Sequence, residues 1–245
     1  MRIALISDIH GNAIALEAVL AEVDGERVDR TICLGDVATL GSQPREVLDI
    51  LRERRMVSVL GNHDEFLFVP ELLHQYATGA PIEAAVDWCR GQLRPADFDY
   101  LMTFERELMV PLDGCESLCL FHGSPRSHME MLLATTPADE LDMMLDGRRG
   151  AVLAGGHTHI QLLRQHRGRL LVNPGSVGMP FTEHIGANPN TPPTILAHAE
   201  YAVVRAEKGR ISVDLRRIEL DKKRLREAAL ASEVPLRGML AAQYA

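Results

Sequence analysis

Long apolar runs are absent from this sequence, and so is any excess of basic charge. No stretch approaches the roughly 18 consecutive apolar residues of a membrane span, so no membrane partner is expected. Lys and Arg number 26 against 34 Asp and Glu, which gives a net charge of −8. No basic patch interleaved with aromatics occurs either, and both observations argue against nucleic acid as the partner. A small phosphorylated substrate is compatible with this charge, because a metal site supplies its own positive charge.

Cysteine is scarce, and its spacing excludes two common structural frames. The four cysteines form no C-x-x-C pair, and Cys33 and Cys119 lie within apolar, strand-like runs. A zinc finger and a disulfide frame are therefore not expected, and buried free thiols are.

The overall composition is that of an ordinary globular protein. Hydrophobic residues make up 46% and charged residues 24% of the 245 positions, and no linker interrupts them. We therefore expect a single domain over residues 1–245. The N-terminal run 1–8 has no cleavage site and predicts a first buried strand rather than a signal peptide, so we expect a cytoplasmic location.

The first half of the chain alternates between strand and helix signals. Short apolar runs predict strands at 3–7, 31–34 and 56–60. Asn12 can cap a helix after the first strand, and Pro44 can open a helix over 44–54 after the second. This rhythm implies an α/β protein with parallel strands and right-handed crossovers.

The rest of the chain divides into a helical region, a β-rich region and a charged tail. Residues 64–104 look mostly helical, and we interpret them as a helical cap inserted near a site. Residues 182–194 are rich in Pro, Asn and Gly, and predict a long loop. Helices are also predicted over 137–145 and 221–232, and the predicted strands are 107–111, 118–121, 151–154, 161–164, 170–172, 201–205 and 211–218.

Five short polar clusters follow apolar strands, and half of the ten histidines lie in them. In an open α/β sheet, functional groups gather where strands end, so these clusters are expected to build one polar site at one edge. The clusters are Asp8-Ile9-His10, Gly35-Asp36, Gly61-Asn62-His63-Asp64, His122-Gly123 and Gly156-His157-Thr158-His159.

Imidazole and carboxylate together suit zinc, manganese or iron. Asp8 and His10 are one residue apart, so both can reach a metal only from an irregular strand end. His157 and His159 have the same spacing. The candidates exceed the needs of one metal, which suggests two ions bridged by Asp36, an arrangement suited to in-line displacement at phosphorus.

At these residues the sequence resembles the calcineurin-like metallophosphoesterases, and within them the small prokaryotic phosphodiesterase branch. The resemblance runs from Asp8 to about Gly178. It includes Leu34-Gly35-Asp36-Val37, His122-Gly123-Ser124-Pro125 and Asn173-Pro174-Gly175-Ser176-Val177-Gly178. It implies a four-layer αββα sandwich, in which two mixed β-sheets lie between outer helices.

The resemblance also implies the site residues and the reaction. One metal would be held by Asp8, His10, Asp36 and His159, and the other by Asp36, Asn62, His122 and His157. A hydroxide bridging the two divalent ions (Mn²⁺, Zn²⁺, Fe or Ni) would attack phosphorus. His63 would stabilise the phosphate or protonate the leaving oxygen, and Asp64 would orient His63.

The substrate is left open by the residues. Leu40, Ser127-His128 and Phe181 depart from the branch's pattern and are expected to line the substrate rim. The expected partner is a small phosphorylated substrate or a phosphoprotein. The alternatives are a phosphomonoesterase or phosphoprotein phosphatase with the same metal core, a nuclease, and a non-catalytic scaffold of the same fold.

Three further features are ambiguous in sequence. His128 fits a substrate contact or a surface position equally well, and Arg126 fits a phosphate ligand or a solvated side chain. The apolar edge near 229–240 fits a partner interface or a cover for the chain's own sheet.

Overall fold

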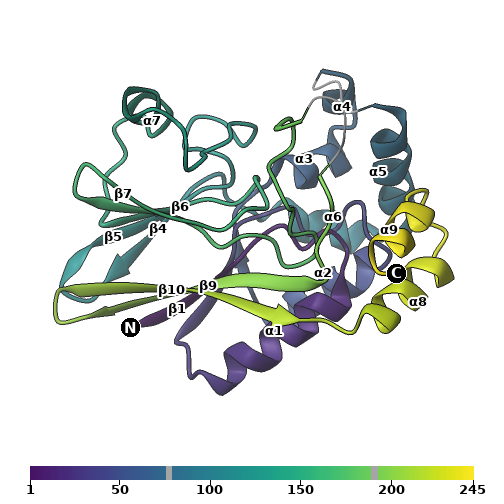
Figure 1. Ribbon diagram of the computed structural model, residues 1–245, viewed down its shortest axis with the longest axis horizontal. Helices are drawn as coiled ribbons and strands as arrows, with labels where there is room; N and C mark the ends of the chain where they lie inside the picture. Colours follow the sequence, from purple (N-terminus) through teal and green to yellow (C-terminus); the bar gives the residue numbers. More distant parts are fainter. Residues whose placement is uncertain (76–78, 189–192) are drawn as a thin grey trace.

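The computed structural model describes residues 1–75, 79–188 and 193–245. Its centre is formed by two mixed five-stranded sheets, ordered β10-β9-β1-β2-β3 and β4-β5-β6-β8-β7 (Figure 1). The strands of the first sheet are β1 (Arg2–Ile6), β2 (Arg30–Cys33), β3 (Val57–Ser58), β9 (His198–Glu207) and β10 (Arg210–Glu219). Those of the second are β4 (Leu108–Leu112), β5 (Cys115–Leu120), β6 (Val152–Ala154), β7 (Leu162–His166) and β8 (Arg169–Asn173).

The first sheet has a parallel half built by two crossover helices. Strands β1, β2 and β3 run parallel, and β9 pairs antiparallel with β1. Helix α1 (Ala13–Gly25) begins where the Asn12 side chain accepts the N–H of Ala15, and α2 (Pro44–Glu53) begins with Pro44 in its first turn. The predicted alternation of strands and helices is confirmed for this half.

The second sheet is also mixed. Strands β5, β6 and β8 run parallel, whereas β4 and β7 pair antiparallel at its two edges. Helix α7 (Ala138–Met144) packs on the face turned away from the first sheet, where Leu141 and Met144 are buried in one apolar cluster with Phe121 and Leu153. The two sheets pack face to face across one apolar cluster. This cluster includes Leu5 and Leu34 from the side of the first sheet and Leu118 and Val152 from that of the second.

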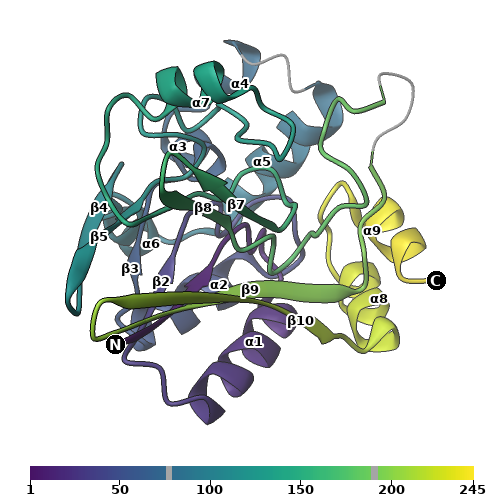
Figure 2. The same ribbon diagram turned by 60° about the vertical axis from the view of Figure 1, so that its left-hand side comes forward.

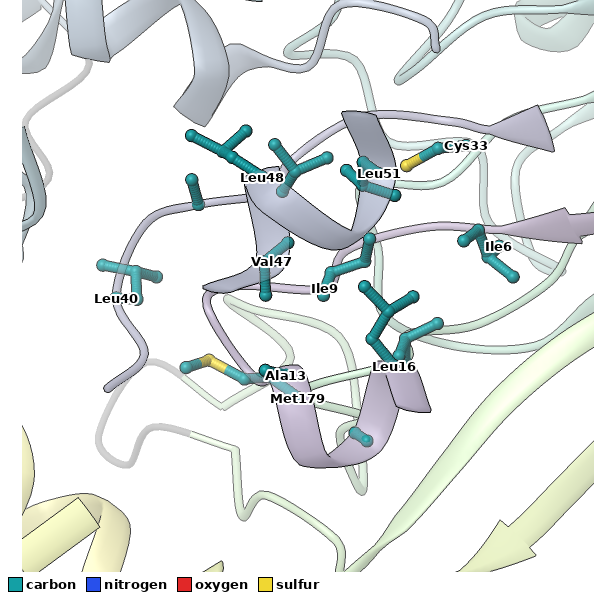
Figure 3. Close-up of a cluster of buried hydrophobic side chains, with 14 of the residues drawn as sticks. Ile6, Ile9, Ala13, Leu16, Cys33, Leu40, Val47, Leu48, Leu51 and Met179 are labelled. Atoms are coloured by element: carbon teal, nitrogen blue, oxygen red, sulfur yellow. The ribbon is translucent and has the colours of Figure 1, made fainter. Parts of the chain in front are cut away.

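The largest apolar cluster covers the opposite face of the first sheet. Figure 3 shows part of it, with Ile6 and Cys33 of the sheet facing Leu16 of α1 and Leu51 of α2. The layers are therefore helices, sheet, sheet and helix, as Figure 2 shows from a second side. The predicted α/β fold, a four-layer αββα sandwich with two mixed sheets, is confirmed.

The region predicted as a helical cap is helical where it is described. It contains α3 (Asn62–Phe68), α4 (Glu71–Gln75), α5 (Ala80–Gln92) and α6 (Pro95–Leu101), while residues 76–78 lie outside the described residues. That these helices form a cap over a bound substrate stays a prediction. The predicted 182–194 loop has no helix or strand in its described part, and its residues 189–192 also lie outside that part.

The C-terminal segment forms two helices, α8 (Lys222–Ala231) and α9 (Arg237–Gln243), of which α9 was not predicted. Leu225, Leu236, Leu240 and Tyr244 are buried in the largest apolar cluster. The apolar edge near 229–240 therefore packs on its own chain, beside α1 and α5 in Figure 1. None of the helices in the described part of the chain is long and apolar enough to cross a membrane.

Candidate metal centre

The five polar clusters meet at the carboxyl ends of parallel strands, but these strands belong to both sheets. Asp8, Asp36 and Asn62 follow β1, β2 and β3 of the first sheet. His122 and His157 follow β5 and β6 of the second. The expectation that one sheet edge gathers all five clusters is wrong. Because the sheets pack face to face, the ends of their parallel strands meet in one place.

The side chains form two adjacent groups that could each hold a metal ion. Within each group the ligand atoms lie within 4.8 Å of one another. The groups are Asp8, His10 and His159, and Asp36, His122 and His157.

Asp36 lies between the two groups. Its Oδ2 is 3.4 Å from Nε2 of His122 and 3.8 Å from Nε2 of His10. Asn62 joins the second group, with its Oδ1 3.0 Å from Nε2 of His122. The structure thus brings together all seven residues predicted as ligands. Their division into two groups agrees with the predicted partition, and their coordination of metal stays a proposal.

The hydrogen bonds of two imidazoles fix which ring nitrogen faces the site. Nδ1 of His122 lies 2.6 Å from the carbonyl oxygen of Leu34, and Nδ1 of His159 lies 2.6 Å from that of Met179. Because a carbonyl oxygen only accepts, each Nδ1 carries the proton, and in the neutral ring Nε2 keeps its lone pair. This is the usual way in which proteins fix a metal-binding imidazole.

The carboxylates of the site also fit a cation. Oδ1 of Asp8 is buried and has no hydrogen-bond partner among the described residues, and it lies 3.4 Å from Nε2 of His159. Nε2 of His159 in turn lies 3.1 Å from Nε2 of His10. In the neutral ring of His159, the lone pairs of its Nε2 and of Oδ1 of Asp8 face each other, and such buried lone pairs are costly unless a positive charge satisfies them. The residues present therefore fit the divalent ions that this donor set favours.

The backbone at most of these residues is in the left-handed region. The prediction that Asp8 with His10, and His157 with His159, sit on irregular strand ends is confirmed. Such a conformation costs a residue with a side chain on the order of 1–3 kcal/mol, and it persists only where its surroundings enforce it. Positive φ angles occur at Asp8 (53°), His10 (45°), Asp36 (58°), His157 (67°) and His159 (58°).

Burial and neighbouring charges shift the pKa values of the histidines of the site in opposite directions. Burial lowers the pKa of His10 and of His157 to about 3, so both imidazoles are neutral at pH 7. Burial acts in the same direction on His122, but the carboxylates of Asp36 and Asp8 outweigh it and raise the pKa of His122 to about 10. The site without metal therefore keeps a proton beside Asp36.

Asp64 differs from its prediction. Its carboxylate does not contact His63, since Nδ1 of that ring has no hydrogen-bond partner among the described residues. Instead, Oδ2 accepts the N–H groups of Gly61 and Asp36, and Oδ1 accepts that of Val37. Burial and Asp36 raise the pKa of Asp64 to about 7. Asp64 thus joins the start of α3 to the loop after β2, because its position at the third residue of α3 faces both sets of amides.

His63 lies beside the two groups and is half-buried. Its ring packs edge-on against that of His10, with the centroids 5.1 Å apart, and its backbone N–H donates to Oδ1 of Asp36 at 2.9 Å. Burial lowers the pKa of His63, so the ring is neutral at pH 7. Because Nδ1 is buried, a substrate oxygen would have to meet the ring at Nε2.

Several residues that support the site were not predicted. Ser176 donates its hydroxyl to the carbonyl of Asp8 at 2.7 Å, and Asn173 donates to the carbonyl of Gly156 at 2.6 Å. Thr39 lies 3.3 Å from Nδ1 of His10. Asn173 and Ser176 belong to the 173–178 motif of the resemblance, so the sequence marks these residues but not the carbonyl groups that they contact.

The expected rim residues behave differently from one another. Leu40 is buried in the largest apolar cluster and does not line a rim. Phe181 stacks on the ring of His159, with the centroids 4.3 Å apart. Arg126 pairs with Glu130 of its own loop, and His128 lies 3.0 Å from Glu65.

Residues 1–188 match the model of the calcineurin-like phosphoesterase superfamily domain, and the chain belongs to that superfamily. It is 26% identical over 236 residues to the uncharacterized protein MJ0912 of Methanocaldococcus jannaschii, covering 95% of this chain and 93% of that protein. A metallophosphoesterase structure from Sphaerobacter thermophilus has a TM-score of 0.70 and 27% identity, covering 99% of this chain and all of that one.

A third similarity is shorter. Over 151 residues the chain is 30% identical to a symmetrical bis(5′-nucleosyl)-tetraphosphatase of Hamiltonella defensa. The match covers 59% of this chain and 52% of that protein.

Proposed function

We propose that this chain is a phosphoesterase that uses two divalent metal ions to hydrolyse phosphodiester bonds. The observation that carries the proposal is the pair of buried ligand groups that meet at Asp36. Two adjacent ions with a shared carboxylate form the arrangement used for in-line displacement at phosphorus. The membership of the chain in the phosphoesterase superfamily supports the same reaction class.

The proposed ligands divide between the ions as the two groups do. Asp8, His10 and His159 would hold one ion, Asn62, His122 and His157 the other, and Asp36 would contact both. Bound there, two divalent ions would supply Lewis-acid charge to the phosphoryl oxygens and lower the pKa of an attacking water.

The residues of the chain would orient the substrate and move one proton. His63 is neutral at pH 7, so one of its ring nitrogens carries a proton that it can donate to the leaving oxygen or share with a phosphoryl oxygen. Its position is fixed from two sides, by the backbone N–H that donates to Asp36 and by the ring contact with Phe66. This placement lets a substrate phosphate bind to the ligand groups and meet His63 at the same time.

A phosphorus with two ester or anhydride substituents is the proposed reacting centre. The relative from Hamiltonella defensa is named for a bis(5′-nucleosyl) tetraphosphate, and every phosphorus in such a molecule has two bridging oxygens. The leaving oxygen of a disubstituted phosphate needs a proton, which the neutral imidazole of His63 can supply. The first of these points favours a diester-type substrate, whereas a proton for the leaving oxygen would serve a diester and a monoester alike.

The test is hydrolysis by protein stripped of metal and then reloaded with Mn²⁺. Bis(p-nitrophenyl) phosphate, p-nitrophenyl phosphate and a diadenosine tetraphosphate are the probes. The loaded protein is expected to cut the first and third probes, and the stripped protein neither. His63→Ala should lower turnover by about 10²- to 10⁴-fold, while its ion content, measured by elemental analysis, should stay at the wild-type level.

Other results would redirect the proposal. Turnover of the monoester alone would make the protein a phosphomonoesterase, including a phosphoprotein phosphatase. Full binding of two ions with no turnover of any probe would favour the non-catalytic scaffold. A loss of ions in His63→Ala would mean that His63 is a ligand rather than a proton donor.

A further inference from the structure

A contact outside the two ligand groups joins the loop after β5 to helix α3. Nε2 of His128 lies 3.0 Å from Oε2 of Glu65, and each side chain is only 13% exposed. Nε2 is buried and has no hydrogen-bond partner among the described residues, so the contact is a close approach of imidazole and carboxylate rather than an aligned hydrogen bond. Neither residue is used in the proposed reaction.

Glu65 is fixed from its other side by the first sheet. Its Oε1 accepts from Nη2 of Arg106 at 2.6 Å. The residue before Arg106 extends the edge of that sheet, since the N–H of Glu105 donates to the carbonyl of Ser58 at 3.1 Å. Glu65 is therefore tied to the strand that leads into Asn62.

His128 is fixed by a tight loop that folds back on Gly123. The N–H of Ser124 donates to the carbonyl of Ser127 at 2.8 Å, and Oγ of Ser124 accepts the N–H of Ser127 at 3.1 Å. A methyl group at Gly123 would lie 2.8 Å from the carbonyl carbon and oxygen of His128. The backbone of His128 thus rests on the residue that directly follows His122.

The contact consequently connects the two elements that carry Asn62 and His122. Glu65 lies three residues after Asn62 on α3, within one turn of the helix. Oδ1 of Asn62 and Nε2 of His122 are 3.0 Å apart, so the Glu65–His128 contact spans the same two elements as this pair of proposed ligands. The other group, Asp8, His10 and His159, lies on the loops after β1 and β6.

We propose that Glu65 and His128 form a positioning clamp for the second ion site alone. The clamp sets the distance between α3 and the loop after β5. It thereby also sets the distance between the side chains of Asn62 and His122. Residues that hold ligands in place typically change metal affinity by about 10- to 100-fold when they are replaced. The proposal rests on the metal centre of the proposed function and assigns residues to one of its two ions.

The experiment measures stepwise binding of Mn²⁺ to metal-stripped protein by calorimetry, with ion content checked after dialysis. Glu65→Gln and His128→Ala are expected to weaken one of the two binding steps by about 10- to 100-fold and to leave the other unchanged. The double variant should be no weaker than either single variant, because both remove one contact. His128→Gln should recover part of the affinity, because its amide nitrogen can take the place of Nε2.

A matched control is an imidazole–carboxylate pair elsewhere in the fold, between a strand and a helix. Nε2 of His166 on β7 lies 2.7 Å from Oδ1 of Asp142 on α7, and neither residue is on an element of the second ion site. His166→Asn should leave both binding steps unchanged. Urea unfolding of each metal-stripped variant shows whether that variant is folded. If His128→Ala does not fold, the binding measurements on Glu65→Gln and His128→Gln decide the test.

The outcomes separate the clamp from the metal centre. Wild-type protein that binds fewer than two ions would overturn the metal centre itself. Wild-type protein that binds two ions, with variants that keep both affinities or lose both equally, would overturn the clamp and leave the centre in place.

Discussion

One carboxylate, that of Asp64, accepts three backbone N–H groups from two separate loops. The amides of Asp36 and Val37 lie in the loop after β2, and that of Gly61 lies at the start of α3. Buried amides need acceptors, and a carboxylate has enough lone pairs to serve all three. Asp64 therefore fixes the backbone of Asp36, the residue that lies between the two ligand groups.

Asp64→Asn is expected to destabilise the fold and weaken ion binding. The asparagine has one carbonyl oxygen, and its NH₂ group would face at least one of the three amides. An unsatisfied buried donor costs about 1–3 kcal/mol, so the free energy of unfolding in urea should fall by about that amount. Asp113→Asn is the control, because Asp113 is exposed in the β4–β5 turn. Equal stability of the two variants would contradict the bridging role of Asp64.

For single residues, the types of side chain in the site could be predicted from the sequence, but the groups that hold these side chains in place could not. Five histidines and three aspartates gathered at strand ends suffice to indicate a metal site, and the structure brings them together. The carbonyls of Leu34 and Met179, which set the tautomers of His122 and His159, have no side-chain signature. The contact between Asp64 and His63 was mispredicted because adjacent residues on a helix point in different directions.

Among the elements, the short C-terminal helix α9 contributes to the main core. Leu240 and Tyr244 are buried in the main core, and Gln243 accepts the N–H of Ile195 at 3.2 Å. A cavity of about 20 Å³ separates this helix from the loops that carry His10 and Gly41. Helix α9 therefore lies on the outer side of loops that carry proposed metal ligands.

Leu240→Ala should lower the free energy of unfolding by about 2–5 kcal/mol, the usual cost of truncating a buried leucine. Leu230→Ala on the neighbouring helix α8 is the matched control, since Leu230 is 50% exposed. Its effect should stay within about 0.5 kcal/mol. Urea unfolding at one pH measures both variants. A similar loss in the two would show that α9 does not contribute to the core.

Elements with strong local signals were predicted and those without were missed. Asn12 and Pro44 mark the starts of α1 and α2 as expected. Strand β3 is shorter than the predicted 56–60, because past Ser58 the chain pairs with Glu105 only through an isolated bridge at Val59. Helix α9 has seven residues and no side-chain cap, so local sequence gives little reason to expect it.

For the whole molecule, the arrangement of the sheets determines the site. The resemblance implied two mixed sheets, but residue patterns alone suggested a single edge, because strand periodicity does not say which sheet a strand joins. In the structure, the first sheet contributes Asp8, Asp36 and Asn62, and the second contributes His122 and His157. Ions bound between these residues would therefore connect the two halves of the sandwich.

Metal removal is expected to lower the unfolding temperature, and by more at higher pH. An ion at 100 times its dissociation constant stabilises the folded state by about 2.7 kcal/mol. The pKa of His122 is raised to about 10, so its contribution to the metal-free fold is complete below about 6.5 and is lost as the pH rises through 10. An ion must displace this proton, so ion affinity rises over the same interval. The stripped protein therefore loses stability as the pH rises, and the gain in ion affinity widens the difference in unfolding temperature between Mn²⁺-loaded and stripped protein from about pH 6.5 to about pH 8.5. Differential scanning fluorimetry would measure both unfolding temperatures. A difference that is constant or shrinks over this range would show that His122 does not exchange a proton for the ion.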